Sequence, residues 1–232
     1  MRQMTTHSII IHLAVLITAA LHGVCASAAE RPTTLPADDI HAETSGQRFL
    51  SRLRGGVEWG YTQGIWHWYH YNYLTDAMAR VNSEDGRFTA NSNGHIYAYI
   101  GYQIGRRWQL DLVSGWAGVW QDRRVVPIDL RVTRYFSGLD NNGFKAFIEA
   151  GEVISHNVAD SDFPSNIMKI GGGYRLMLTS RSAVDLSVSL QRCIDHPANV
   201  HDPTYNLDVA PDHLRRSDTS YTGINFSISI NL

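Results

Sequence analysis

The sequence predicts an all-β fold, an eight-stranded antiparallel up-and-down transmembrane β-barrel. Three observations support this prediction: an export signal at the N-terminus, segments of alternating hydrophobicity along the chain, and one such segment at its C-terminal end. In residues 219–232, apolar side chains on one face of a strand alternate with Gly, Asn and Ser on the other. The apolar face comprises Ile224, Phe226, Ile228, Ile230 and Leu232. An apolar face suits lipid, and a polar face suits the lumen of a barrel.

The first 28 residues have the features of a secretory signal peptide. An apolar stretch runs from Ile9 to Ala20, and the small residues Ala26 and Ala28 form a cleavage site. This stretch is shorter than the about 20 residues that a membrane-spanning helix needs. We therefore expect residues 1–28 to be removed and residues 29–50 to form a flexible periplasmic segment, followed by a barrel over residues 51–232.

Charge and cysteine content narrow the class of protein. The chain has 20 Lys and Arg against 22 Asp and Glu, so its charge gives no argument for nucleic acid as a partner. Cleavage of the signal removes Cys25 and leaves Cys193 alone, so no disulfide framework can hold this exported chain together. An ordinary secreted β-sandwich is the alternative fold.

Eight segments after Phe49 have the pattern of strands. They are residues 51–72, 95–105, 108–121, 125–136, 144–156, 167–178, 183–194 and 219–232. Three short turns, at 105–107, 137–143 and 179–182, fall on one side of the predicted barrel. The connections on the other side are 73–94, 122–124, 157–166 and 195–218, and three of these four are long and polar. Short periplasmic turns and longer outer loops are typical of outer-membrane barrels.

The alternation also assigns side chains to the two faces of each strand. The charged residues predicted to point inward are Glu58, Asp111, Asp129, Arg131, Lys145, Glu149, Lys169, Arg175 and Asp185. An eight-stranded barrel is only wide enough for its own side chains, so these charges must pair across the lumen and plug it. A narrow gated pore is the alternative. Inward glycines at 101, 115, 151, 171 and 173 leave room for the long side chains opposite.

The aromatic segment Trp66–Tyr73 departs from this alternation. Before it, Val57, Trp59, Tyr61 and Ile65 are predicted to face lipid. We interpret the segment as an aromatic belt at the outer membrane interface, where each ring has one wet end.

The chain resembles the small eight-stranded outer-membrane β-barrels of Gram-negative bacteria, the group that includes the transmembrane domain of outer membrane protein A. It looks closest to uncharacterised barrels of Bacteroidetes. The segments that carry the resemblance are Val57–Tyr61, Arg123–Pro127 and Gly171–Arg175. The resemblance implies location in the outer membrane, with membrane lipid, lipopolysaccharide and the barrel-insertion machinery as partners. Such barrels typically end in an aromatic residue that this machinery recognises, whereas this chain ends in Leu232.

Two chemistries are considered for the last outer loop. A lipid A deacylase-like barrel would need a His-x-Ser pair, but after His196 this chain has Ala198 where the serine nucleophile should stand. A metal site would need the loop's carboxylates and imidazoles to converge, whereas their irregular spacing favours solvated surface. These residues are Asp195, His196, His201, Asp202 and His213.

We therefore assign no catalytic, cofactor-binding or metal-binding residue and expect no cofactor. His67 and His70 lie three residues apart, so on one strand they face opposite sides and cannot bind one metal ion together. The sequence favours a structural or interaction barrel over an enzyme. We expect the long outer loops 73–94 and 195–218 to offer a surface to an extracellular ligand.

Overall fold

The computed structural model of the chain describes residues 50–120, 123–156 and 165–232. The predicted signal peptide and nearly all of the predicted periplasmic segment lie outside the described residues. Within the described part, no helix is long and apolar enough to cross a membrane.

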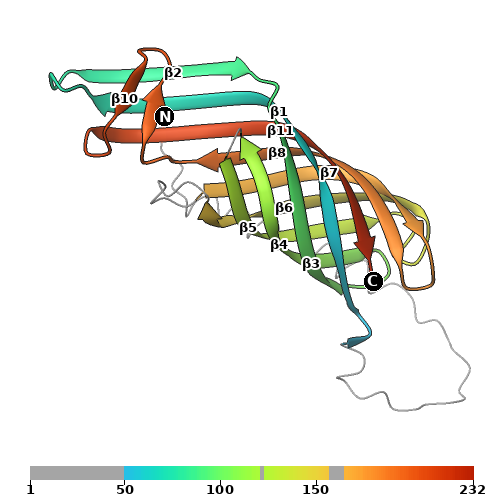
Figure 1. Cartoon of the computed structure of the whole chain (residues 1–232). Helices are drawn as coiled ribbons and strands as arrows, with labels where there is room; N and C mark the ends of the chain where they lie inside the picture. The colour runs from blue at the N-terminus through green and yellow to red at the C-terminus, as the bar shows by residue number, and fades with distance from the viewer. Residues whose placement is uncertain (1–49, 121–122, 157–164) are drawn as a thin grey trace, which may run out of the picture. The chain divides into compact units, whose positions relative to one another are not determined.

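Eight antiparallel strands close into a barrel, as predicted (Figure 1). Each barrel strand pairs with the next one along the chain, and the last pairs with the first through a register that runs from Gly56 opposite Asn231 to Tyr73 opposite Leu214. The barrel strands are β1 (Leu53–Leu74), β3 (Ser92–Gln103), β4 (Trp108–Trp120), β5 (Arg123–Tyr135), β6 (Gly143–His156), β7 (Ser165–Met177), β8 (Ala183–Asp195) and β11 (Leu214–Asn231).

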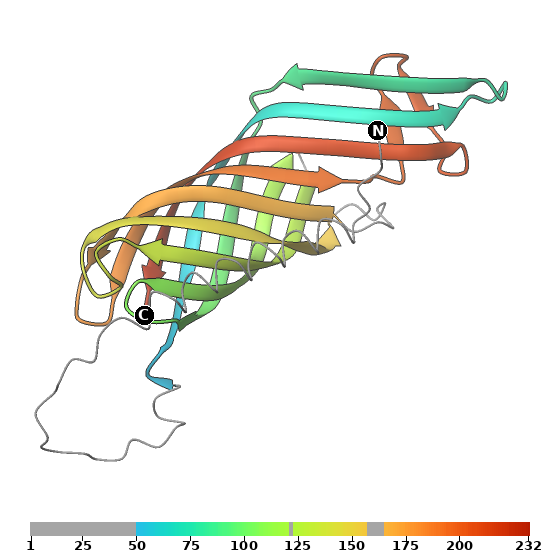
Figure 2. The same ribbon diagram turned by 180° about the vertical axis from the view of Figure 1, so that it is seen from behind.

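Two segments that the sequence analysis predicts to be outer loops contain strands instead. The segment 73–94 contains a ninth strand of the sheet, β2 (Arg80–Phe88), which pairs with the upper part of β1. The segment 195–218 contains a small hairpin of β9 (Val200–Asp202) and β10 (Leu207–Val209), and then the start of β11. Strands β1, β2 and β11 therefore extend beyond the other strands at one end of the barrel (Figures 1 and 2).

A β-bulge in β1 explains why the alternation of the sequence fails there. The register with β11 shifts between Gly64 and Trp66. Below this shift the even-numbered Glu58 and Thr62 are buried, and above it the odd-numbered His67 and Tyr69 are buried. An extra residue in one strand reverses the faces of everything that follows. The aromatic segment thus continues as a regular strand. Its tyrosines Tyr69, Tyr71 and Tyr73 are buried, so they cannot belong to the predicted interfacial belt, whereas Trp66 and Trp68 lie on the outward face.

The outward face of the barrel is apolar, as the alternation predicts. Large apolar side chains are exposed on every barrel strand. They include Val57, Trp59, Tyr61, Ile96, Ile100, Leu112, Trp116, Ile128, Leu130, Ile148, Ile170, Leu186, Val188, Leu190, Phe226 and Ile230. All nine charged side chains predicted to point inward are buried. A water-soluble sandwich would show the opposite arrangement, with its apolar side chains in the interior.

Candidate functional site

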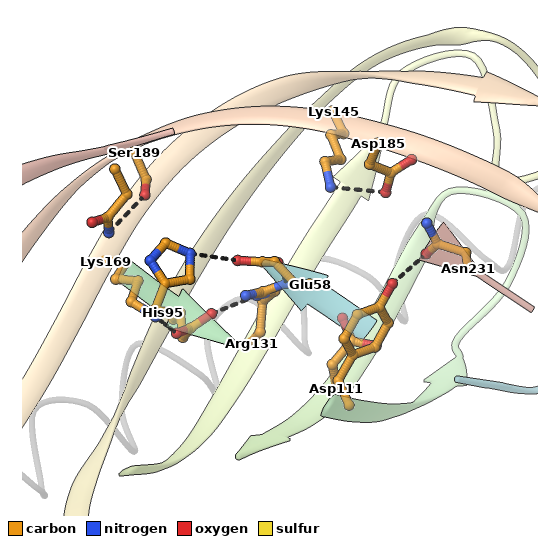
Figure 3. A network of polar contacts seen from close by, with 12 residues as sticks. Glu58, His95, Asp111, Arg131, Lys145, Lys169, Asp185, Ser189 and Asn231 are labelled. Atoms are coloured by element: carbon orange, nitrogen blue, oxygen red, sulfur yellow. Dashed lines mark hydrogen bonds and ion pairs between the residues drawn. The ribbon is translucent and has the colours of Figure 1, made fainter. Parts of the chain in front are cut away.

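The middle of the lumen holds a network of charged side chains from four strands. Arg131 of β5 donates from Nη1 to Glu58 Oε2 of β1 (2.7 Å) and from Nε to Glu149 Oε2 of β6 (2.5 Å). Lys169 of β7 donates from Nζ to Glu149 Oε1 (2.5 Å). Glu149 therefore pairs with two cations at once. Through Arg131, strand β6, which is next to β5 in the sheet, is connected to β1 on the far side of the lumen; Figure 3 shows the bond between Arg131 and Glu58. We call these four residues the mid-barrel network.

A second network lies near the short turns, which we call the short-turn network. Asp185 of β8 accepts hydrogen bonds from Lys145 Nζ (2.8 Å) and Arg175 Nε (2.7 Å). Arg175 also donates to Asn231 Oδ1 (2.8 Å) and to the carbonyl oxygen of Leu139 (3.1 Å). Leu139 belongs to the turn after β5 and is buried, so the network fixes this turn under the end of the lumen.

Aromatic rings fill the space around the buried cations. Lys169 Nζ lies 4.1 Å from the centre of the Tyr97 ring, and the Arg175 guanidinium lies 4.1 Å from that of Tyr135. The inward glycines leave the room that the sequence predicts: a Cβ at Gly101 would collide with the Asp111 carboxylate, and one at Gly151 with that of Asp129. Ion pairs, aromatic rings and close packing against the glycines leave the charged side chains of the lumen almost inaccessible to solvent.

The lumen is not polar throughout, which corrects the prediction of one polar interior. An apolar cluster of inward side chains runs along the lumen, from Tyr99, which donates to Asn231 of the short-turn network (2.8 Å), to Tyr221 toward the end from which β1 and β11 extend. It contains Tyr97, Tyr99, Val113, Ala117, Val119, Val125, Val153, Cys193 and Tyr221. In strand β4 the outward Leu112 is followed directly by the inward Val113, so sequence alternation cannot separate the two faces there. Among the described residues Cys193 is a free cysteine and is buried.

Beyond the barrel, β1, β2 and β11 form a sheet against which the β9–β10 hairpin packs. We call β2, the hairpin and the adjoining parts of β1 (residues 69–74) and β11 (residues 214–219) the extension. Its own small core contains Tyr69, Tyr71, Tyr73, Val200 and Val209, with Val81 and Leu214 packed against it. The predicted loops 73–94 and 195–218 therefore contribute to a folded module, whereas most of the predicted loop 157–166 lies outside the described residues. His67, three residues before His70, is buried on the opposite face of β1.

One buried carboxylate, that of Asp202, attaches the hairpin to the sheet. Asp202 accepts hydrogen bonds from the hydroxyl groups of Tyr73 (3.0 Å) and Ser83 (3.1 Å) and from the backbone N–H of Thr204 (2.8 Å). Burial and the hydrogen bond to Asp202 raise the pKa of Tyr73 to about 12, so the phenol remains a hydrogen-bond donor at neutral pH.

The structure does not bring the five candidate metal ligands of the last loop together. Asp195 pairs with Arg123 and accepts a hydrogen bond from Ser165. His196 pairs with Asp218, His201 with Asp208, and His213 lies 3.7 Å from Asp76. Within the described ranges, no group of three or more His, Cys, Asp or Glu side chains could hold a metal ion.

His196 and Asp218 lie beside a groove of about 360 Å³ at the edge of the extension. Its lining residues are His196, Ala198, Pro211, Leu214, Arg215, Arg216, Ser217 and Asp218. The hydrogen bond from His196 Nδ1 to Asp218 Oδ1 (3.0 Å) raises the pKa of the imidazole, and the pKa of Asp218 is lowered by its two cationic partners against the opposing effect of burial. Ala198, at the position of the missing serine, lies on the wall of this groove.

Comparison with known proteins finds likeness in structure but not in sequence. No protein-family model matches the chain, and no curated protein matches it in sequence. The structure is similar to that of the outer membrane protein OprG from Pseudomonas aeruginosa, with 11% identity, a TM-score of 0.46, and coverage of 77% of this chain and 95% of that one.

Two further solved structures are similar over most of their length. The outer membrane protease OmpT from Escherichia coli has 8% identity and a TM-score of 0.38, and the match covers 77% of this chain and 95% of that one. The outer membrane protein AlkL has 10% identity and a TM-score of 0.33, with coverage of 86% and 96%.

Proposed function

We propose that this protein is an outer-membrane β-barrel with a plugged, non-conducting lumen, and that its function is recognition of a ligand by the extension outside the cell. Residues in the barrel then serve to anchor and position the extension. Because β1 and β11 run without interruption from the barrel into the extension, the module is held rigidly on its anchor.

The observation that carries this proposal is the mid-barrel network. Arg131 spans the lumen between Glu58 and Glu149, and each of these three side chains is at most 7% exposed. An ion crossing the lumen would have to break pairs that are already desolvated, which costs several kcal/mol for each charge. A closed lumen leaves the extension as the part of the protein that is available for recognition.

The outward face supports location in a membrane. Strands β3 to β8 are 12 to 14 residues long, and a barrel strand needs about 9–11 residues to cross a bilayer. Along β8 the outward Val184, Leu186, Val188 and Leu190 cover about 20 Å of strand. Acyl chains are the partner that such a face requires, and the predicted export signal agrees with this location. We propose lipopolysaccharide and the barrel-insertion machinery as further partners.

Electrical recordings test whether the lumen is plugged. The folded protein is first shown to float with lipid vesicles and to change its gel mobility on boiling, as closed barrels do. Reconstituted in a planar bilayer, it should then give no discrete conductance steps.

Discrete steps that change in Glu149→Gln, but not in the outward control Glu152→Gln, would replace the plug with the gated pore. Release of the protein from membranes by a salt wash alone would overturn the membrane location as well.

A further inference from the structure

The groove at the edge of the extension is open because strand pairing ends beside it. The last residue of β8 to pair with β11 is Asp195, opposite Thr219. From Leu214 to Asp218, β11 still pairs with β1 on one side, but on the other side its edge is flanked by the groove and by His196. The groove walls combine the apolar Ala198, Pro211 and Leu214 with charged side chains.

The groove has an excess of positive charge. Arg215 and Arg216 line it together with His196, and Asp218 is the one carboxylate among the lining residues. Asp218 accepts from Arg216 Nε (2.5 Å) and Nη2 through Oδ2, and from His196 Nδ1 (3.0 Å) through Oδ1. These bonds fix the orientation of the Arg216 guanidinium, which remains exposed, as does Arg215. A fixed guanidinium beside a second arginine suits a phosphate group.

The groove lies immediately beyond the apolar outward face. On the outward face of β11, Asp218 and Arg216 follow Ser220 and Thr222, and Ser220 accepts a hydrogen bond from Arg192 of β8 (2.8 Å). Below Arg192 and Thr222 come the apolar residues Leu190 and Ile224. Trp68 lies opposite Ser220 in the neighbouring strand β1. Such an order, from apolar to Trp and Arg, is typical of the head-group level of a membrane.

We propose that this groove binds a phosphate group on the sugar head group of a glycolipid in the surrounding outer leaflet. Arg215 and Arg216 bind the phosphate, the apolar wall of Pro211 and Leu214 packs against the sugar ring, and the acyl chains follow the outward face of β8 and β11. This assignment rests on the proposed outer-membrane location, because only there does a lipid phosphate meet the groove.

The test measures binding of lipid A to the whole protein, folded in detergent, by native mass spectrometry. The probes are lipid A with two phosphates, its monophosphorylated form, and inorganic phosphate. The variant Arg215→Ala/Arg216→Ala should weaken binding of the diphosphorylated probe by about tenfold or more, since charge-assisted hydrogen bonds are lost. The matched control, Arg106→Ala/Arg107→Ala, removes two arginines from the turn at the other end of the barrel and should leave binding unchanged. Arg216→Lys should recover binding only in part, because lysine keeps the positive charge but cannot hold Asp218 through two fixed donors while it presents a further N–H to the phosphate.

Equal loss in the groove variant and the control would reduce the effect to general charge and overturn the site. Inorganic phosphate that binds as tightly as lipid A would overturn the lipid as ligand. If the protein floats with vesicles but the groove variant binds lipid A as tightly as the unchanged protein does, this inference alone is contradicted. If the protein does not enter vesicles, the proposed function is contradicted.

Discussion

The barrel and its extension both bury carboxylates, but they neutralise them differently. In the lumen, Glu149 and Asp185 each pair with two cations. In the extension, Asp202 accepts from two hydroxyl groups and one backbone N–H, which are neutral donors. The cations offset the cost of desolvating Glu149 and Asp185. The predicted pairing of all inward charges is wrong for Asp129, which is fully buried and whose carboxyl oxygens have no hydrogen-bond partner among the described residues.

This difference implies two kinds of rigidity. Removal of one side chain of a buried ion pair leaves an isolated charge, which opposes folding of the whole barrel. Removal of one hydrogen-bonded acceptor leaves uncharged donors, which cost less, and the hairpin can open to water. The barrel is therefore expected to unfold as one unit, and the hairpin to detach by itself.

The largest expected effect is that of Arg131→Met. The substitution leaves Glu58 without its arginine and Glu149 with Lys169 alone, so the free energy of unfolding should fall by about 3–5 kcal/mol. Urea unfolding in lipid vesicles, followed by tryptophan fluorescence, measures the change. The control is Arg134→Met on the same strand, where the arginine lies outside over the rings of Trp108 and Phe136. Similar losses in both variants would contradict the view that the lumen network stabilises the barrel.

A slightly smaller effect is expected from Val188→Arg, in the middle of the apolar outward face. The half-exposed Val188 side chain would contact acyl chains, and arginine there should cost roughly 2–4 kcal/mol in vesicles. The neighbouring Ser189 faces the lumen. Ser189→Ala should be tolerated because the hydrogen bond that Ser189 accepts from Asn225, its partner in the described part of the chain, is long (3.4 Å). The same unfolding measurement compares them, and equal effects would mean that the outward face does not contact lipid.

How much of this structure the sequence predicts depends on what the alternation of apolar and polar residues specifies. Alternation gives the face of a side chain, so the eight barrel strands and the nine inward charges could be predicted. Alternation does not give the register between strands, so the pairing of Arg131 with both Glu58 and Glu149 could not be predicted. The bulge at Ile65 appears in the sequence only as a loss of alternation from Trp66 on, which does not reveal that the faces of β1 reverse there. Strands β9 and β10, of three residues each, are too short for a pattern to detect.

The candidate site was predicted less completely than the fold. The loop histidines stand out in the sequence, but their separate carboxylate partners come from distant segments, such as Asp218 for His196 and Asp76 for His213. Arg215 and Arg216 stand side by side in the sequence and could have been noted as a basic pair. Their place beside the groove depends on where pairing of β8 with β11 ends, which composition does not determine.

The smallest expected effect is that of Asp202→Ala, which tests whether the hairpin is attached independently of the barrel. The hydroxyl groups of Tyr73 and Ser83 and the N–H of Thr204 lose their acceptor, which should cost about 1–3 kcal/mol locally. Hydrogen exchange should then become faster in residues 200–209, while exchange in β5 and β6 stays unchanged. The control is Asp208→Ala, which removes an exposed carboxylate on the same hairpin whose partner is His201. Faster exchange throughout the barrel strands would show that hairpin and barrel unfold together, and that the extension is a continuation of the barrel core.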